Sequence, residues 1–208
     1  MSLYHQPFDA IIVRERPALF MQYRNISRSL PKGGLLLFPG DIAFFGSLYF
    51  QHVERRRPDA GFFHQSRLVG AGPRALLSSR WREVAPRKAE LSLADYAAAL
   101  TNNAARRGHP VLIEPHSGNM SSINAPDLAL EPLGLFKAVG GGRLPLASRL
   151  DPFQFLIVRD GVKAAREDNP FTGEIFVYYA GAYSMWVDVF ARRTEWGKAL
   201  EWYQKAFL

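Results

Sequence analysis

The 208-residue chain contains no cysteine, which excludes disulfides and thiolate metal sites. It also lacks any run of about eighteen apolar residues, so we expect no membrane-spanning helix within it. Neither a Gly-x-Gly-x-x-Gly fingerprint nor a Gly-Lys-Ser/Thr loop occurs, which argues against nucleotide binding by the standard routes. The sequence therefore predicts no cofactor, and no set of residues at ligand spacing predicts a metal.

Hydrophobic residues make up 48% of the chain, enough for a sizeable core, and the aromatic residues among them account for 13% of the chain. The formal charge is +7, but no nucleic-acid-binding motif accompanies it, so we predict no nucleic-acid partner. A basic face against anionic lipid fits the same charges. The basic residues lie scattered in short groups at Arg55-Arg56-Arg57, Arg80 and Arg82, Arg87-Lys88, Arg106-Arg107 and Arg192-Arg193.

Hydrophobic periodicity predicts strands alternating with helices. A continuous apolar run at 34–39 is typical of a strand buried on both faces. We expect helices at 16–30, 42–56, 74–82, 92–107, 171–193 and 196–208, and strands at 34–39, 60–64, 110–113 and 133–139; residues 152–159 are ambiguous. The cations Arg55, Arg56 and Arg57 are expected at the C-terminus of the helix 42–56, where the helix dipole favours positive charge.

This pattern predicts an α/β fold. We expect a three-layer Rossmann-like domain over residues 4–160, with a mostly parallel sheet of four or five strands. Residues 161–208 are expected to form a C-terminal α-hairpin packed on that domain.

Residues of about 20–82 carry a family resemblance. The successive segments are Leu30-Pro31-Lys32-Gly33, Gly40-Asp41, Leu48-Tyr49-Phe50-Gln51-His52-Val53-Glu54, Arg57-Pro58-Asp59, Ser66-Arg67-Leu68 and Trp81. Together they resemble the soluble region that follows the membrane helices in multi-pass bacterial proteins related to protein O-mannosyltransferases. Two later segments, Gly108-His109-Pro110-Val111 and Leu133-Gly134-Leu135-Phe136, resemble strand starts of the same family. The chain departs from the family after Gly40-Asp41, where Ile42-Ala43-Phe44-Phe45-Gly46 replaces a polar stretch and leaves Asp41 as the turn's one carboxylate.

The resemblance implies a fragment of a longer protein, with membrane helices before residue 4 and an extracytoplasmic, periplasmic location. It also implies that any glycosyltransferase chemistry lies in the membrane portion. A second resemblance covers the C-terminus, where Tyr183, Trp186, Phe190, Ala199, Tyr203 and Ala206 follow the spacing of a tetratricopeptide helix pair.

Polar residues at expected strand ends are the candidate binding residues, namely Asp41, Ser66, Glu114, His116 and Asn119. For Asp41 we favour a helix N-cap over a ligand contact. For Glu114 and His116 we favour ordinary loop chemistry over acid–base catalysis or half a metal site. His52 and His64 are predicted to be surface or partly buried side chains rather than ligands.

Two functions remain open. The first is a non-catalytic accessory or binding domain of a membrane glycosyltransferase-like protein, which binds glycan, peptide or a partner protein. The second is a small independent α/β enzyme with a strand-end site at Asp41, Glu114 and His116. The aromatic helix around Tyr178, Tyr183 and Trp186 is interpreted as core packing, with a sugar- or partner-binding platform as the alternative.

Overall fold

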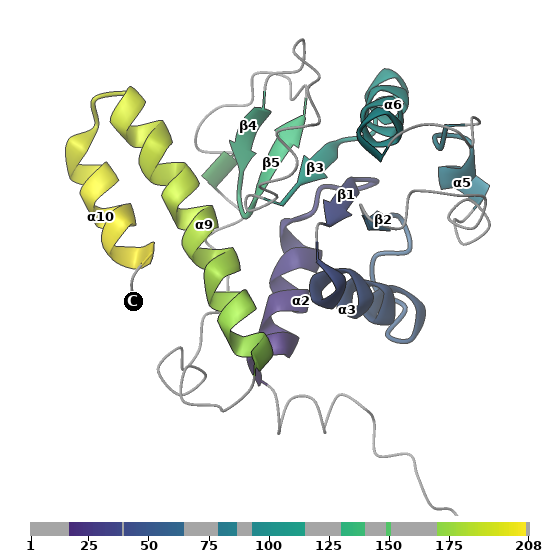
Figure 1. Ribbon diagram of the computed structural model, residues 1–208, viewed down its shortest axis with the longest axis horizontal. Coiled ribbons are helices and arrows are strands. Elements are labelled where there is room, and N and C mark those ends of the chain that lie inside the picture. Colours follow the sequence, from purple (N-terminus) through teal and green to yellow (C-terminus); the bar gives the residue numbers. More distant parts are fainter. Residues whose placement is uncertain are drawn as a thin grey trace, which may run out of the picture.

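The computed structural model describes residues 17–38, 40–64, 79–86, 93–114, 130–139, 149–150 and 170–206. It is a mixed α/β structure in which helices surround a five-stranded sheet (Figure 1). The described elements are α2 (Pro17–Ser29), β1 (Leu35–Phe38), α3 (Asp41–His52), β2 (Gly61–His64), α5 (Ser79–Arg82), α6 (Leu93–Arg106), β3 (Val111–Ile113), β4 (Leu130–Leu133), β5 (Phe136–Val139), α9 (Pro170–Arg192) and α10 (Trp196–Ala206). The ambiguous residues 152–159 lie outside the described ranges.

The sheet has the order β2-β1-β3-β5-β4. Strand β1 pairs in parallel with β2 and β3, whereas β5 is antiparallel to both β3 and β4. The sheet is therefore parallel at one end only, and β2 and β4 are its edges. Parallel neighbours place their carboxyl ends at one edge of the sheet, so β1, β2 and β3 define a common carboxyl edge.

The expected single strand at 133–139 is wrong, because this segment belongs to a hairpin. Strand β4 ends at Leu133, β5 begins at Phe136, and Leu133 pairs with Phe136 across the turn. Gly134 has a φ of +55°, a conformation that glycine adopts without the penalty of a Cβ atom. A glycine inside an apolar run thus turns the chain back on itself.

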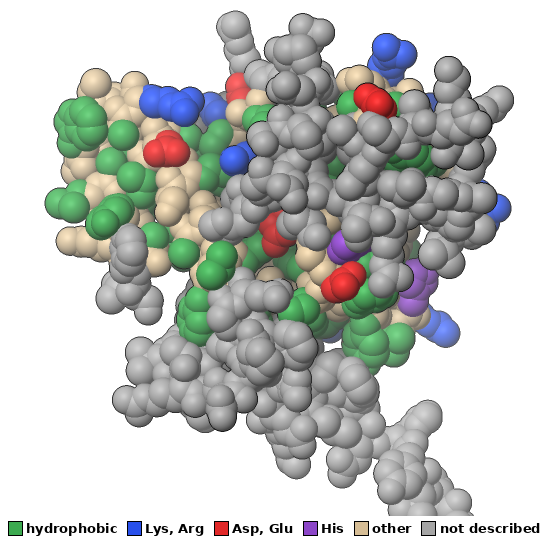
Figure 2. Space-filling view, in the orientation of Figure 1, with side chains coloured by type: hydrophobic (Ala, Val, Ile, Leu, Met, Phe, Trp, Pro, Cys, Tyr) green, Lys and Arg blue, Asp and Glu red, His purple; other side chains and the backbone are tan. Residues whose placement is uncertain are grey.

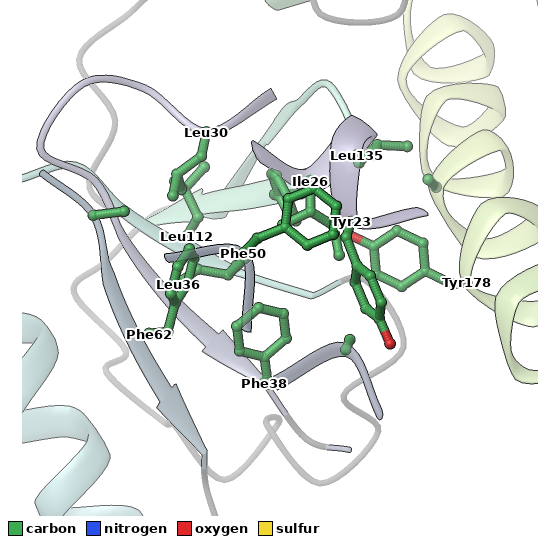
Figure 3. Packing of buried hydrophobic residues seen from close by; sticks show 14 of the residues in the cluster. Tyr23, Ile26, Leu30, Leu36, Phe38, Phe50, Phe62, Leu112, Leu135 and Tyr178 are labelled. Carbon is green, nitrogen blue, oxygen red and sulfur yellow. The ribbon is translucent and has the colours of Figure 1, made fainter. Parts of the chain in front are cut away.

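Strand β1 is completely buried, as its continuous apolar run predicts: Leu35, Leu36, Leu37 and Phe38 have no exposed surface. Alternate residues point to opposite faces of the sheet. Leu36 and Phe38 pack in a cluster with side chains of α2, α3 and α9, including Tyr23, Phe50 and Tyr178 (Figure 3). Leu35 and Leu37 pack in a second cluster with Trp81, Leu100 and Ala104 of α5 and α6. Each face of the sheet therefore carries its own hydrophobic core.

The long helix α9 connects the sheet with α10. Tyr178 and Ala182 pack in the cluster of the sheet, whereas Trp186 and Phe190 pack in a separate cluster with Ala199 of α10. Figure 1 shows α9 between the sheet and α10. The Trp186 indole N–H donates to the Gly134 carbonyl oxygen at 2.9 Å and so connects α9 to the β4–β5 turn. Core packing is thus confirmed for Tyr178, Trp186 and Phe190, which are all buried.

No helix within the described ranges combines the length and the apolar character needed to cross a membrane.

Candidate functional site

A row of side chains crosses the carboxyl edge of the parallel strands. The register places His64, the last residue of β2, beside Phe38 of β1. On the other side of β1, Leu37 pairs with Ile113 of β3, so Glu114 follows beside Phe38. Two inter-strand spacings of about 4.8 Å separate β2 from β3, which puts the ends of the row about 10 Å apart. We call His64, Phe38 and Glu114 the edge row.

The edge row lies on the face of the sheet that α2, α3 and α9 cover. Phe62 and Leu112, two residues before His64 and Glu114, both belong to the hydrophobic cluster on that face. Because the side-chain period of a strand is two, His64 and Glu114 are directed to the same face. Both are buried, with 4% and 7% of their surface exposed. A buried imidazole and a buried carboxyl group therefore flank a phenylalanine on one side of one sheet.

Asp41 lies next to one end of the edge row. Its Oδ1 is 3.3 Å from Nε2 of His64, and its side chain is 63% exposed, so it lies between the buried histidine and solvent. The predicted N-cap role of Asp41 is wrong: Gly40 occupies the N-cap position and Asp41 is the first residue of α3. A carboxylate in the first turn still interacts favourably with the helix dipole.

His64 is the residue that the sequence interpretation missed, because it was expected to be at the surface or only partly buried. Its ring packs edge-on against Phe44 of α3, with ring centroids 5.3 Å apart. The available signal was its position as the last residue of an apolar strand, two residues after Phe62. The exposed position of His52, by contrast, agrees with the sequence.

At the other end of the edge row, Glu114 interacts electrostatically with Tyr178 of α9. Burial raises the pKa of Tyr178 well above its ordinary value, and the nearby Glu114 carboxyl group raises it further. The Tyr178 hydroxyl is buried and has no hydrogen-bond partner among the residues that the structure describes. A buried hydroxyl in that condition is costly, and such groups commonly meet water or a ligand.

Of the predicted site residues, Asp41 and Glu114 are placed at this carboxyl edge. Ser66, His116 and Asn119 lie outside the described residues, in segments that follow His64 and Glu114 directly along the chain. Figure 2 shows acidic and histidine side chains close together on the surface over the region where β1, β2 and α3 meet. Searched over the described ranges alone, no three His, Asp or Glu side chains form a group that could hold a metal ion.

The opposite, amino-terminal edge of the strands carries a different polar cluster. The guanidinium of Arg57 donates to the carbonyl oxygens of Ser27, at 2.6 Å, and Pro31, at 2.7 Å, and to that of Leu30. It also forms a two-pronged ion pair with Asp59, with both donor–acceptor distances at 3.0 Å. Arg57 thus caps the C-terminus of α2 by donating hydrogen bonds to its last carbonyl oxygens and those just after it. The expected role of Arg57 at the dipole of its own preceding helix is wrong, since α3 ends at His52.

Asp59 completes this cluster, which we call the arginine clasp and define as Arg57 and Asp59. Asp59 Oδ2 accepts a hydrogen bond of 2.7 Å from the Gly33 amide. The Arg57 hydrogen bond and the Gly33 amide together hold the pKa of Asp59 well below its usual range. Gln51 of α3 donates to the carbonyl oxygens of Arg57 and Ala60, at 2.9 and 2.8 Å. The motif residues that carry the family resemblance here join α2, α3 and β2, which is a structural role.

The two edges therefore differ in what their polar groups can do. In the arginine clasp, the Arg57 donors already bind backbone carbonyls and the Asp59 carboxylate within the protein. At the carboxyl edge, Asp41 and His64 offer an acid–base pair, Glu114 offers an acceptor and Tyr178 offers a donor. Comparison of this chain with protein-family models, with curated proteins and with solved structures found no match.

Proposed function

We propose that this chain is a non-catalytic binding or accessory domain and that its ligand site is the edge row with Asp41 and Tyr178. The observation that carries the proposal is the placement of His64 and Glu114 on one face of the sheet, at the carboxyl edge of parallel strands. Ligands of open α/β sheets bind in the crevice outside that edge. Glycan, peptide and a partner protein are the candidate ligand classes.

The chemistry of the site favours a hydroxyl-rich ligand such as a glycan. Carboxylates of Asp41 and Glu114 accept hydrogen bonds from hydroxyl groups, and Tyr178 donates one. Phe44, which packs on His64, adds an aromatic surface of the kind that sugar rings contact. Reversible binding needs no further group, so no catalytic step is assigned.

The setting of the domain is part of the same proposal. The resemblance to the soluble region of O-mannosyltransferase-like membrane proteins supports an extracytoplasmic position, with membrane attachment through a preceding portion of a longer protein. We interpret the fold as a three-layer Rossmann-like domain, supported by a hydrophobic cluster on each face of the sheet. We interpret α9 and α10 as a tetratricopeptide-like hairpin, supported by their shared aromatic cluster.

Glycan binding is tested by titrating the chain with mannose and mannobiose and following amide chemical shifts by NMR. We expect shifts of residues around Asp41, His64 and Glu114 that saturate at millimolar sugar. Glu114→Gln should weaken binding at least about fivefold, because a charged hydrogen-bond acceptor contributes more than a neutral one. Glu83→Gln is the matched control, since that carboxylate is exposed and pairs with Arg107 away from the site. Equal binding by both variants would remove the edge row from the proposal.

The contact between Asp41 and His64 favours one alternative, a small α/β enzyme. An imidazole that lies beside a carboxylate can act as a general base or acid. His64 would take the place that sequence reasoning gave to His116 beside Asp41 and Glu114. A screen with p-nitrophenyl glycosides and esters tests this alternative. Turnover by the wild-type chain that both Asp41→Asn and His64→Gln abolish would replace the binding proposal with the enzyme.

A further inference from the structure

Helix α10 carries an exposed apolar stripe, which we define as Trp196, Leu200 and Tyr203. These side chains are 66%, 58% and 52% exposed. Their spacing of four and three residues places them on one face of the helix. Figure 2 shows hydrophobic side chains on the surface over α10.

The stripe is separate from the face of α10 that packs on α9. Ala199 is buried, and the Trp202 ring lies 5.9 Å from Trp186 and 5.8 Å from Phe190 between ring centroids. The buried face of α10 therefore already packs against α9. The stripe is the more exposed side of α10, and large apolar side chains aligned on an exposed helix face mark an interaction surface.

A second copy of this chain fits the stripe poorly. Three side chains exposed to this degree offer on the order of 400 Å², if each buries about 150–250 Å² in full. A stable protein–protein interface takes about 800 Å² from each partner. In addition, the formal charge of +7 on each copy opposes self-association.

A bilayer surface suits the stripe better, because it requires no matched shape. Tryptophan and tyrosine are enriched where membranes meet water, and leucine adds apolar contact. Lys198 and Lys205 lie on the face of α10 opposite the stripe, where they pair with Glu195 and Glu201, and Arg193 at the end of α9 also pairs with Glu195. The charge that attracts anionic headgroups is therefore the formal net charge of +7 on the chain as a whole.

We infer that α10 docks on an anionic lipid surface through Trp196, Leu200 and Tyr203. The inserted side chains enter the headgroup region, and the positive charge of the chain strengthens binding to anionic over neutral lipid. This inference is independent of the ligand site at the carboxyl edge, which lies on other elements.

Flotation of the chain with vesicles tests the inference. We expect it to float with vesicles of phosphatidylglycerol and phosphatidylcholine, to float less with phosphatidylcholine alone, and to be released in part by added salt. Leu200→Glu should lower partitioning at least about tenfold, because it replaces apolar contact with a charge. Val53→Glu is the matched control, because Val53 is a valine 60% exposed on a different element, at the end of α3.

Several results would overturn the inference. One is absence of flotation on both vesicle types, and another is equal flotation of wild type and Leu200→Glu. A concentration-dependent dimer that Leu200→Glu dissociates, without vesicle binding, would assign the stripe to a second copy instead. If Leu200→Glu loses its helical circular dichroism signal, Trp196→Ser becomes the deciding variant. Glu114→Gln should float like wild type, which separates this test from that of glycan binding.

Discussion

Arg57 shows how much one residue can contribute to the fold. Its backbone has a φ of +53°, a left-handed conformation that is uncommon for a residue with a Cβ atom. The strain is offset by hydrogen bonds from its guanidinium to carbonyl oxygens at the end of α2 and to Asp59. The last carbonyls of a helix have no intrahelical donor, so an outside donor is stabilising there.

The clasp leads to a prediction for Arg57→Lys. Lysine keeps the charge but cannot donate in the fork geometry that reaches both the α2 carbonyls and Asp59. We expect the free energy of unfolding to fall by about 2 kcal/mol, as for the loss of charged hydrogen bonds. Urea denaturation, monitored by circular dichroism, measures this change in the free energy of unfolding.

Arg55→Lys is the control for that measurement. Arg55 also has a φ of +53°, is exposed, and carries the same charge two residues away. Its replacement should change the unfolding free energy by less than about 0.5 kcal/mol. Equal losses in the two variants would mean that the arginine clasp does not stabilise the fold.

At the scale of elements, the crossing of α2 and α3 depends on Gly46. A Cβ atom there would lie 1.8 Å from Cζ of Tyr23, which is too close for any real contact. The Tyr23 hydroxyl donates to the Ile42 carbonyl oxygen of α3 at 3.2 Å, so the ring is held at the crossing. The glycine therefore sets how closely the two helices approach.

Gly46→Ala should consequently destabilise the protein by about 2 kcal/mol or more, because overpacking forces either Tyr23 or the helix to shift. Gly197→Ala in α10 is the control, since nothing lies within 4 Å of its added Cβ atom. That change should instead stabilise by about 0.5–1 kcal/mol, through the higher helix propensity of alanine. Thermal unfolding of both variants measures these changes. An unchanged melting temperature for Gly46→Ala would show that the crossing of α2 and α3 has room for a methyl group.

The elements themselves were largely predictable, whereas contacts distant in sequence were not. The apolar run at 34–39 and the periodicity at 92–107 predict β1 and α6, because the signals are local. The hairpin at Gly134 was missed because a glycine within an apolar run has no distinct pattern. Arg57 was misread because its acceptors lie about thirty residues earlier in the chain, at the end of α2.

The candidate site was predictable only in part, for a similar reason. Asp41 and Glu114 follow strands directly, so their place at one edge follows from parallel pairing. The contact of His64 with Asp41 depends on the register of β2 against β1, which no local pattern specifies. Tyr178 joins the site from α9, more than sixty residues after Glu114, through packing alone.

On the scale of the whole molecule, buried tyrosines link α2 and α9 to the sheet. The Asn25 side-chain amide donates to the Tyr179 hydroxyl at 2.7 Å, joining α2 to α9. Burial raises the pKa of Tyr23 to about 12 and raises the pKa values of Tyr179 and Tyr183 as well. Their common cause is removal from water, which disfavours the phenolate.

These shifts predict loss of stability in alkaline solution. Tyrosine in the unfolded chain ionises near pH 10, whereas Tyr23 in the folded chain ionises near pH 12. A raised pKa gives a contribution that is complete below about pH 10 and is lost as the pH rises toward about 12. Urea unfolding at successive pH values, with tyrosinate absorbance at each, should show this decline, and Tyr23→Phe should make it shallower. A flat profile up to pH 12 would contradict the buried state of these rings.

The outer edge of the sheet has a consequence for how the molecule behaves in a crowded solution. Strand β4 is one of the two edges, and an edge strand presents open backbone groups to which further strands can add. Pro132 lies in its middle and has no amide hydrogen, and beside it the charged side chain of Glu131 pairs with Arg149. Proline and charge on an edge strand both discourage strand addition. The β4 edge is thereby protected against the sheet-to-sheet growth that leads to aggregates, and Pro132→Val would remove part of that protection.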